Sequence, residues 1–360
     1  MFDLILYAWT LNSSNKFQKT AIIDSASSVI WVTRYNTAGQ FELYLRASKE
    51  MLKYFYSGYN DILITRDDSD AVMIVDDIQL TTDFENGDYL TITGQDGGGI
   101  LGRRVIGEQT NFTGTAENCI RNLIDKCIIN PTIPERKINN FVLAAAQGYT
   151  DQITKQVTGK NLLETVSEIC AKYGYGFRVT FDGTNFVFTL YKGVDRSSGQ
   201  TTNQPVIFSP GYENIGNTSF SFKKSGFKTA VYVAGEGEGS DRKIVYVSYA
   251  LAGLQRRETW DDSRNTSSTT DGGELTPTEY RTILVEQGQE TLRENLFALD
   301  FSGEILNVNS YQYGVDYGLG DTVTVKNQYG ITGKTTISEI TEVEDAEGYR
   351  LIPTFSEWSV

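Results

Sequence analysis

The sequence predicts an α+β protein that is mainly β, with two β domains separated by an inserted α/β domain. Three observations predict this class. The 360-residue chain is long enough for two or three domains. Its hydrophobic residues (39%) and charged residues (22%) occur at the frequencies of a folded protein with real cores. Strand-like alternation dominates residues 1–110 and 203–360, whereas helical periodicity dominates residues 111–202.

Residues 1–110 are expected to form the first β domain. Apolar and polar side chains alternate over residues 41–46, which is typical of a strand with one solvated face. The turn-forming residues 36–39 pair this strand with a partner at about 28–35. Polar turns separate further strands, expected at 61–65, 71–75 and 89–93.

Residues 111–202 contain two apolar stripes with helical spacing. The first covers residues 116–127 and should end at Asn130-Pro131, because the residue before a proline avoids the helical conformation. The second covers residues 162–173, with Asn161 and Glu164 resembling a capping box and Gly174 as a natural stop. Two strands joined by a turn at 182–183 are expected to follow, at 176–181 and 186–191.

Residues 203–360 are expected to form a second β domain with one helix. A Thr at the cap, a Pro at the first position and a Glu at the third predict a helix over 277–298. The almost purely polar residues 261–273 predict a mobile loop before it. Strands are expected at 230–234, 243–249, 303–309, 322–326 and 335–343.

Charge and composition exclude several classes of function. A net charge of −14 and a pI near 4.6 argue against tight binding to a nucleic-acid backbone. The absence of histidine removes catalytic triads and dyads that need it. The N-terminus lacks the features of a signal peptide, and no apolar run is long enough to span a membrane. Synthesis and folding in a cytoplasm are therefore expected.

Three cysteines lie on predicted helix faces. Cys119 and Cys127 are eight residues apart, roughly 12 Å along one helix, which is too far for a disulfide. Cys170 lies on the second apolar stripe. We interpret all three as small core residues; a reactive or metal-binding thiol is the alternative.

Other clusters have a functional and a structural interpretation. Residues 97–102 match G-x-G-x-x-G, but Gly107 would interrupt a following helix, so a flexible connecting loop is favoured over a cofactor site. Residues 235–239 predict a mobile hairpin tip. For Asp67, Asp68, Asp70, Asp76 and Asp77, solvated turns are favoured over a Ca²⁺ site. For Trp9, Trp31, Trp260 and Trp358, packing in a core or an interface is favoured over stacking on sugars. No catalytic, cofactor-binding or metal-binding residue is predicted.

Five segments together resemble the siphophage Gp-thirty-seven-like tail protein family, which is similar to baseplate hub and tail-associated tip proteins. The most specific is Tyr191–Ser197, of the form Y-x-G-x-D-R-S. Two of the others are strands, G-x-F-E-L at 39–43 and L-G-D-x-V at 319–323. The remaining two are a region with G-x-D at 94–96 and L-x-R-R at 101–104, and a helix start G-K-N-L-L-E at 159–164. One departure is the glycine triplet at 97–99, where the family more often has bulkier residues.

The resemblance implies a non-enzymatic structural hub of a phage or phage-derived tail tip or baseplate. It implies two β-barrel-like tail-tube domains and a homotrimer whose six barrels form a ring that continues the tail tube. Expected partners are the tube or distal tail protein ring, the tape-measure protein and a tip fibre or spike, with DNA passing through the lumen unbound. The protein would be made in the cytoplasm of a host bacterium and located in the virion. A module that binds the host cell wall, and a glycan hydrolase that uses only carboxylates, remain as alternatives.

Overall fold

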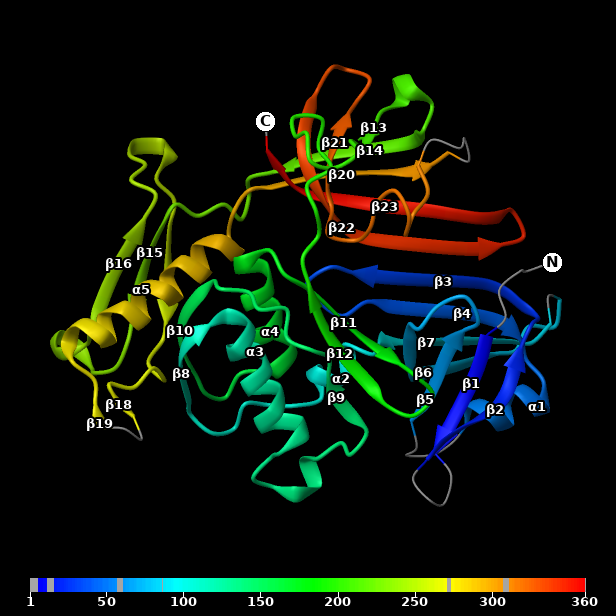
Figure 1. Ribbon diagram of the computed structural model, residues 1–360, viewed down its shortest axis with the longest axis horizontal. Coiled ribbons are helices and arrows are strands. Elements are labelled where there is room, and N and C mark those ends of the chain that lie inside the picture. The colour runs from blue at the N-terminus through cyan, green and yellow to red at the C-terminus, as the bar shows by residue number, and fades with distance from the viewer. Residues whose placement is uncertain are drawn as a thin grey trace.

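A 13-stranded sheet is the main element of the computed structural model, which describes residues 6–11, 16–56, 61–85, 87–270, 273–306 and 311–359 (Figure 1). Its strands run in the order β14-β20-β23-β22-β3-β4-β7-β6-β5-β1-β2, with β21 on β22 and β13 on β21. The strands are β1 (Leu6–Leu11), β2 (Phe17–Ile23), β3 (Ala26–Arg34), β4 (Gln40–Arg46), β5 (Ile62–Arg66), β6 (Val72–Thr81), β7 (Tyr89–Asp96), β13 (Ile207–Phe208), β14 (Ile215–Lys223), β20 (Ala298–Ile305), β21 (Thr322–Lys326), β22 (Thr332–Asp345) and β23 (Gly348–Ser359).

One antiparallel pairing joins the two ends of the chain within this sheet. β3 pairs with β22, with Arg34 opposite Glu339 and Val29 opposite Glu344. The mainly β class is therefore confirmed, but the two β regions share one sheet. In the described part of the chain the strand order is an open path from β14 to β2, so the barrel-like form that we expected is not confirmed.

The strands expected in the first 110 residues are all present, as β3 to β7. Missing from the prediction were β1 and β2, and helix α1 (Lys49–Phe55), which Ser48 caps by accepting a hydrogen bond from the Met51 amide. A further difference lies at the glycine triplet. Gly99–Gly102 form a short helix, α2, and Gly97, Gly98 and Gly99 are buried, so this segment is not the flexible loop that we predicted.

Both helices expected in the middle of the chain are present. α3 (Ala116–Ile124) continues into a π-helical turn, η1 (Asp125–Ile129), and α4 (Leu162–Tyr173) is capped by Asn161 and ends at Gly174 in the left-handed conformation. Two small sheets accompany them: β8 (Thr110–Thr115) with β10 (Gln152–Val157), and β9 (Phe141–Leu143) with β12 (Phe186–Tyr191) and β11 (Gly176–Phe181). β8 begins at Thr110, close to the expected boundary at 110/111, whose position stays a prediction.

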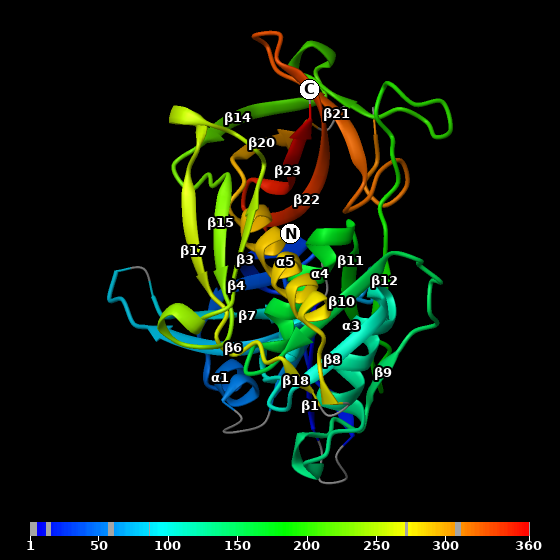
Figure 2. The ribbon, with the colours of Figure 1, turned by 90° about the vertical axis from the view of Figure 1, so that its left-hand side faces the viewer.

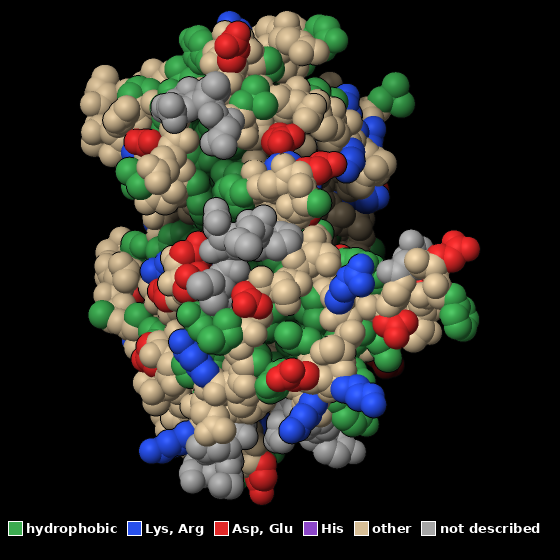
Figure 3. Space-filling model, turned by 90° about the vertical axis from the view of Figure 1, so that its right-hand side faces the viewer, with side chains coloured by type: hydrophobic (Ala, Val, Ile, Leu, Met, Phe, Trp, Pro, Cys, Tyr) green, Lys and Arg blue, Asp and Glu red, His purple; other side chains and the backbone are tan. Residues whose placement is uncertain are grey.

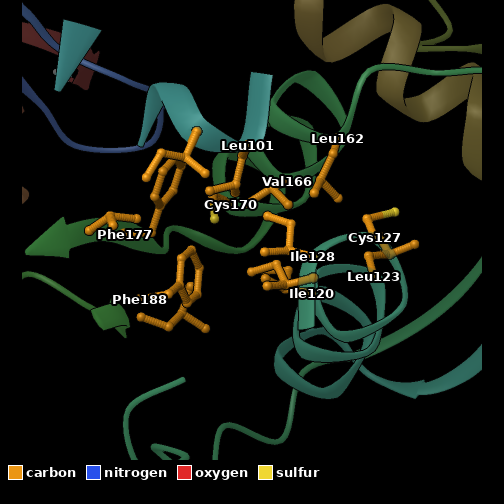
Figure 4. Packing of buried hydrophobic residues seen from close by; sticks show 14 of the residues in the cluster. Leu101, Ile120, Leu123, Cys127, Ile128, Leu162, Val166, Cys170, Phe177 and Phe188 are labelled. Carbon is orange, nitrogen blue, oxygen red and sulfur yellow. The ribbon is translucent and has the colours of Figure 1, made fainter. Parts of the chain in front are cut away.

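The largest core lies between these helices and the β11–β12 sheet. Its aliphatic side chains from α3, η1 and α4 meet the rings of Phe177 and Phe188 (Figure 4). All three cysteines are buried and free: Cys119 and Cys170 are close to fully buried, and burial raises the pKa of Cys119 to about 12. The interpretation of the cysteines as core residues is confirmed.

The remaining unit is a three-stranded sheet with a long helix. Its strands are β15 (Ala230–Ala234), β16 (Ile244–Ser248) and β17 (Glu258–Asp262), and helix α5 (Pro277–Glu294) lies against one face (Figure 2). Thr276 and Glu279 form the expected capping box. Short elements complete the chain: β18 (Thr269–Thr270), β19 (Gly273–Glu274), and the 3₁₀ turns Pro134–Arg136, Pro210–Tyr212, Gly239–Asp241 and Gly253–Gln255.

Two expectations for this unit need adjustment. α5 ends at Glu294 and not at 298, because Asn295 caps it and the apolar residues that follow lead into β20. The polar stretch at 261–273 has anchors that its composition did not predict. Thr266 is buried and accepts a hydrogen bond from the Gln287 side chain of α5 (Nε2 to Oγ1, 2.7 Å). The Gln156 side chain accepts one from the Ser267 amide at 2.8 Å. Its mobility stays a prediction.

A buried ion cluster attaches α5 to the middle of the chain. Lys155 of β10 donates to both carboxylate oxygens of Glu290 of α5, at 2.7 and 2.9 Å, and to Glu168 of α4 at 3.2 Å. Burial by itself lowers the pKa of Lys155, but the charges of Glu290 and Glu168 more than offset it, so the pKa lies above its ordinary value. Lys155 therefore remains charged and links three elements.

Lys155→Met should lower the free energy of unfolding by about 3–5 kcal/mol, because it leaves the Glu290 carboxylate buried without its cation and Glu168 with Lys160 alone. Lys160→Met is the matched control: Lys160 also pairs with Glu168, but its side chain is half exposed, so its loss should cost below about 1 kcal/mol. Urea unfolding followed by circular dichroism measures both. Equal losses for the two variants would contradict the assignment of Lys155 as the anchor.

Candidate functional site: the junction of the β regions

Tyr35, which follows β3, contacts several parts of the chain that meet at this junction. Its hydroxyl donates to the Gly174 carbonyl at 2.8 Å and accepts from the Gly193 amide at 3.0 Å. Its own amide donates to the Ser338 carbonyl of β22 at 2.9 Å. Gly320 lies so close to the ring that a Cβ there would come within 2.1 Å of it. One side chain thus joins the first strands, the α4 terminus, the segment after β12 and β22.

Asp321 holds the segment that follows β12. One carboxylate oxygen accepts from the Val194 amide at 2.8 Å, and the other accepts from Arg196 Nε at 2.8 Å and from the Gly318 amide at 2.9 Å. Gly193 is required here, because a Cβ would lie 1.9 Å from the Gly320 carbonyl oxygen. The Y-x-G-x-D-R-S and L-G-D segments of the sequence therefore meet in one hydrogen-bonded joint.

Asp96 forms a second joint at the end of β7. Its carboxylate accepts from the Gly39 amide in the β3–β4 turn at 2.7 Å and from the Gly98 amide at 2.8 Å. Burial raises the pKa of Asp96 to about 6, although these amides and the charge of Arg34 act in the opposite direction. The G-x-F-E-L and G-x-D segments thus meet here.

A third joint connects α2 to the start of α4. The Asn161 side chain donates to the Gly102 carbonyl at 2.8 Å and accepts from the Leu163 amide at 2.9 Å. The Leu162 amide donates to the Arg104 carbonyl at 2.9 Å. Each segment that we used for the resemblance is therefore a component of a joint between parts of the fold, and none of them forms a cluster of reactive side chains.

Arg66 is an electrostatic link that the sequence analysis missed. Its guanidinium donates two hydrogen bonds to Asp68, at 2.8 and 2.7 Å, and pairs with Glu342 of β22 at 2.9 Å, above the ring of Trp31. Burial by itself lowers the pKa of Arg66, but the hydrogen bond to Asp68 and the charges of Glu342 and Asp68 raise it by more. The pKa therefore lies above its ordinary value, and Arg66 stays charged. A charged residue at the end of an otherwise apolar strand was the available signal.

A groove of about 1530 Å³ lies along this junction. Arg34, Arg66 and Arg178 line it together with Asp96, Tyr313 and side chains of β22 and β23. Two of these arginines are in ion pairs, Arg66 with Glu342 at 2.9 Å and Arg34 with Glu339 at 2.7 Å. The groove lies between the two β regions, and its lining combines polar and apolar side chains.

Two of the five aspartates between residues 67 and 77 are in ion pairs. Asp68 pairs with Arg66, and Asp76 pairs with Arg103 at 3.3 Å. Within the described ranges, no three His, Cys, Asp or Glu side chains are grouped in a way that could hold a metal ion. In the same ranges no helix is long and apolar enough to cross a membrane.

The tryptophans have different environments. Trp31 is buried in the core. Trp9 is half-buried and packs against the large core, where it donates to Thr65 Oγ1 at 2.8 Å and lies edge-on to Phe181. Trp260 is exposed on β17. The side chain of Trp358 lies outside the described residues. The core interpretation is thus confirmed for two of the four.

Comparison with solved structures defines the class of protein. The tail protein of Neisseria meningitidis MC58 has a TM-score of 0.57 at 14% identity, over 99% of this chain and 97% of its own. The 43 kDa tail protein of prophage MuSo2 from Shewanella oneidensis (TM-score 0.51, 14% identity, 97% of both chains) and the prophage tail protein gp18 from Listeria monocytogenes EGD-e (0.51, 12%, 99% and 94%) are also similar. The fold is that of phage and prophage tail proteins.

Within this class, the chain belongs to the family described as Siphovirus ReqiPepy6 Gp37-like protein, whose family model matches residues 9–355. The resemblance inferred from the five segments is therefore confirmed. The curated proteins include no match to this chain.

Gly193→Ala should weaken the junction, because its methyl group would collide with the Gly320 carbonyl. We expect the free energy of unfolding to fall by about 1–3 kcal/mol, as for other overpacked sites. Gly226→Ala is the control, since a Cβ there meets no atom within 4 Å, and its effect should stay within about 0.5 kcal/mol. Urea unfolding measures both. A Gly193→Ala variant as stable as the wild type would contradict the close approach of Gly193 to the Gly320 carbonyl.

The raised pKa of Asp96 predicts a pH dependence. Between the ordinary carboxyl pKa of about 4 and a pKa of about 6, the folded protein binds a proton at Asp96 that the unfolded chain does not. The contribution of Asp96 to stability therefore falls as the pH rises through this window. Relative to Asp96→Asn, which does not titrate, the wild type should lose about 2–3 kcal/mol between about pH 4 and pH 7. Urea unfolding across this range tests it; a constant difference would refute the assignment.

Proposed function

We propose that this chain is a non-enzymatic structural hub of a phage or phage-derived tail tip or baseplate, forming a homotrimeric ring that continues the tail tube. Family membership and fold support a tail role. The observation that carries the finer proposal is the β3–β22 pairing, which makes one chain present two β regions side by side. Three such chains supply six β regions, which matches a sixfold tube partner.

The shared sheet has two chemically different faces near this pairing. Trp31, Phe41, Leu43 and Ile340 are buried on one face. The other face is mixed: Gln40, Glu42, Thr93, Gln95 and Thr341 share it with the apolar side chains of Ile30 and Val32. A face of this kind is suited to the wall of a channel, because exposed neutral and acidic side chains such as Gln40 and Glu42 do not hold DNA phosphates.

Charge is compatible with a channel that DNA passes without binding. The chain carries a net charge of −14. On the face at the right of Figure 1, acidic and basic side chains are interspersed (Figure 3). In this proposal the tube or distal tail protein ring contacts the hub on one side. The tape-measure protein and a tip fibre or spike are its further partners, and the assembled virion is its location.

The molar mass in solution tests the proposal most directly. Light scattering of the purified chain should give about three times its 40.2 kDa, and averaged electron images should show a ring with six lobes and an open centre. A chain that remains a monomer, both alone and when mixed with the tube protein of the same tail, would contradict the trimeric hub.

A further inference from the structure

The β15–β17 sheet has an inner and an outer face of contrasting chemistry. Val231, Val233 and Val245 point inward and form a small core with α5. Because side chains alternate along a strand, the residues between them point outward. Three of these are aromatic, one on each strand: Tyr232, Tyr246 and Trp260. Figure 2 shows α5 on one side of this sheet only.

Strand register brings the three rings into a single row. Tyr232 lies directly opposite Tyr246 on β16 and directly opposite Trp260 on β17. The centroids of the two tyrosine rings are 5.2 Å apart. Since neighbouring strands are separated by about 4.8 Å, the row spans about 10 Å across the sheet. Tyr232, Tyr246 and Trp260 are 36%, 41% and 53% exposed, so this aromatic row is open to solvent.

Each end of the aromatic row carries an arginine that is already paired. Arg256 lies over the Tyr246 ring at 5.2 Å, donates to its hydroxyl at 2.6 Å and pairs with Glu258. At the other end, Arg242 lies over the Trp260 ring at 5.7 Å. Arg242 also donates to the Ala234 carbonyl at 2.9 Å and pairs with Asp262. These bonds fix both guanidinium groups before any ligand arrives.

We propose that the aromatic row is a binding site for an uncharged glycan chain. The C–H faces of pyranose rings stack on exposed aromatic rings, and a row of three offers a continuous platform for them. The arginine–carboxylate pairs at both ends present donors and acceptors to sugar hydroxyls. The Arg256–Glu258 pair is neutral overall, and at the other end Asp262 is shared by Arg242 and Arg264, with Glu238 acting on Arg264 as well. Both ends therefore carry charges of both signs and present polar atoms to sugar hydroxyls without selecting a charged chain.

The arginine–carboxylate pairs at the two ends of the row also disfavour an acidic polymer and a protein partner. An acidic polymer would meet the carboxylates of Glu258 and Asp262, which are already paired with Arg256 and with Arg242 and Arg264. A protein partner that covered the row would have to remove both ion pairs from water, which costs more than their attraction returns unless the geometry is excellent. A glycan leaves the pairs hydrated, because its hydroxyl groups replace water.

Calorimetric titration of the full chain tests this site. The probes are neutral oligosaccharides of glucose, of galactose and of N-acetylglucosamine, with heparin as the acidic comparison. At least one neutral probe should bind saturably and shift tryptophan emission to the blue as Trp260 becomes covered. Trp260→Ala and Tyr232→Ala should each weaken that binding about tenfold, the equivalent of about 1.4 kcal/mol.

Tyr329→Ala is the matched control, because Tyr329 is a tyrosine that is 84% exposed outside the aromatic row. It should bind the probe as the wild type does, and circular dichroism should show all variants folded. Absence of binding to every neutral probe, stronger binding to heparin, or binding that both row variants leave intact would overturn the proposal. A lower molar mass of the assembly in the row variants, without glycan binding, would also overturn it by assigning the row to a protein contact.

Discussion

The pairing of β3 with β22 is the constraint on which the rest of the structure depends. These strands are about 300 residues apart in the chain, and their hydrogen bonds convert two separate β regions into one sheet. Closing so long a loop costs conformational entropy, so side chains must stabilise the contact. Arg34 of β3 and Glu339 of β22 do so as a direct pair, and Arg66 of β5 pairs with Glu342 of β22 above the Trp31 ring of β3. We call this β3–β22 pairing the seam, and the middle of the chain packs around it.

The seam explains why the family's recognisable segments contain so many glycines and aspartates. At each joint, backbone approaches backbone closely and a carboxylate or amide side chain accepts the amide hydrogens that remain. Gly193 with Asp321, and Gly39 with Asp96, are two examples. Buried amides without an acceptor would destabilise the fold, so these residue types are required by the architecture. Such a pattern supports a scaffold more than a catalyst.

Two surfaces of the molecule serve different purposes in the functions proposed above. The face of the large sheet that carries Gln40, Glu42 and Thr341 extends across the β3–β22 pairing, because that pairing joins the two β regions. The aromatic row belongs to the β15–β17 sheet, which α5 and the buried Lys155–Glu290 pair attach to the middle of the chain. Because the attachment is separate from the seam, a binding surface on this sheet is compatible with a ring built from the rest.

The sequence by itself determined the local elements and the family. Alternation at 41–46, the helical stripe at 162–173 with its Asn161 cap and Gly174 stop, and the capping box at Thr276 depend on neighbouring residues only. Tertiary structure alone decided that β3 meets β22, that the glycine triplet is buried beside Val179, and that Tyr232, Tyr246 and Trp260 form a row. The physical reason is that strand pairing between distant segments depends on register and on surfaces that a local pattern does not encode.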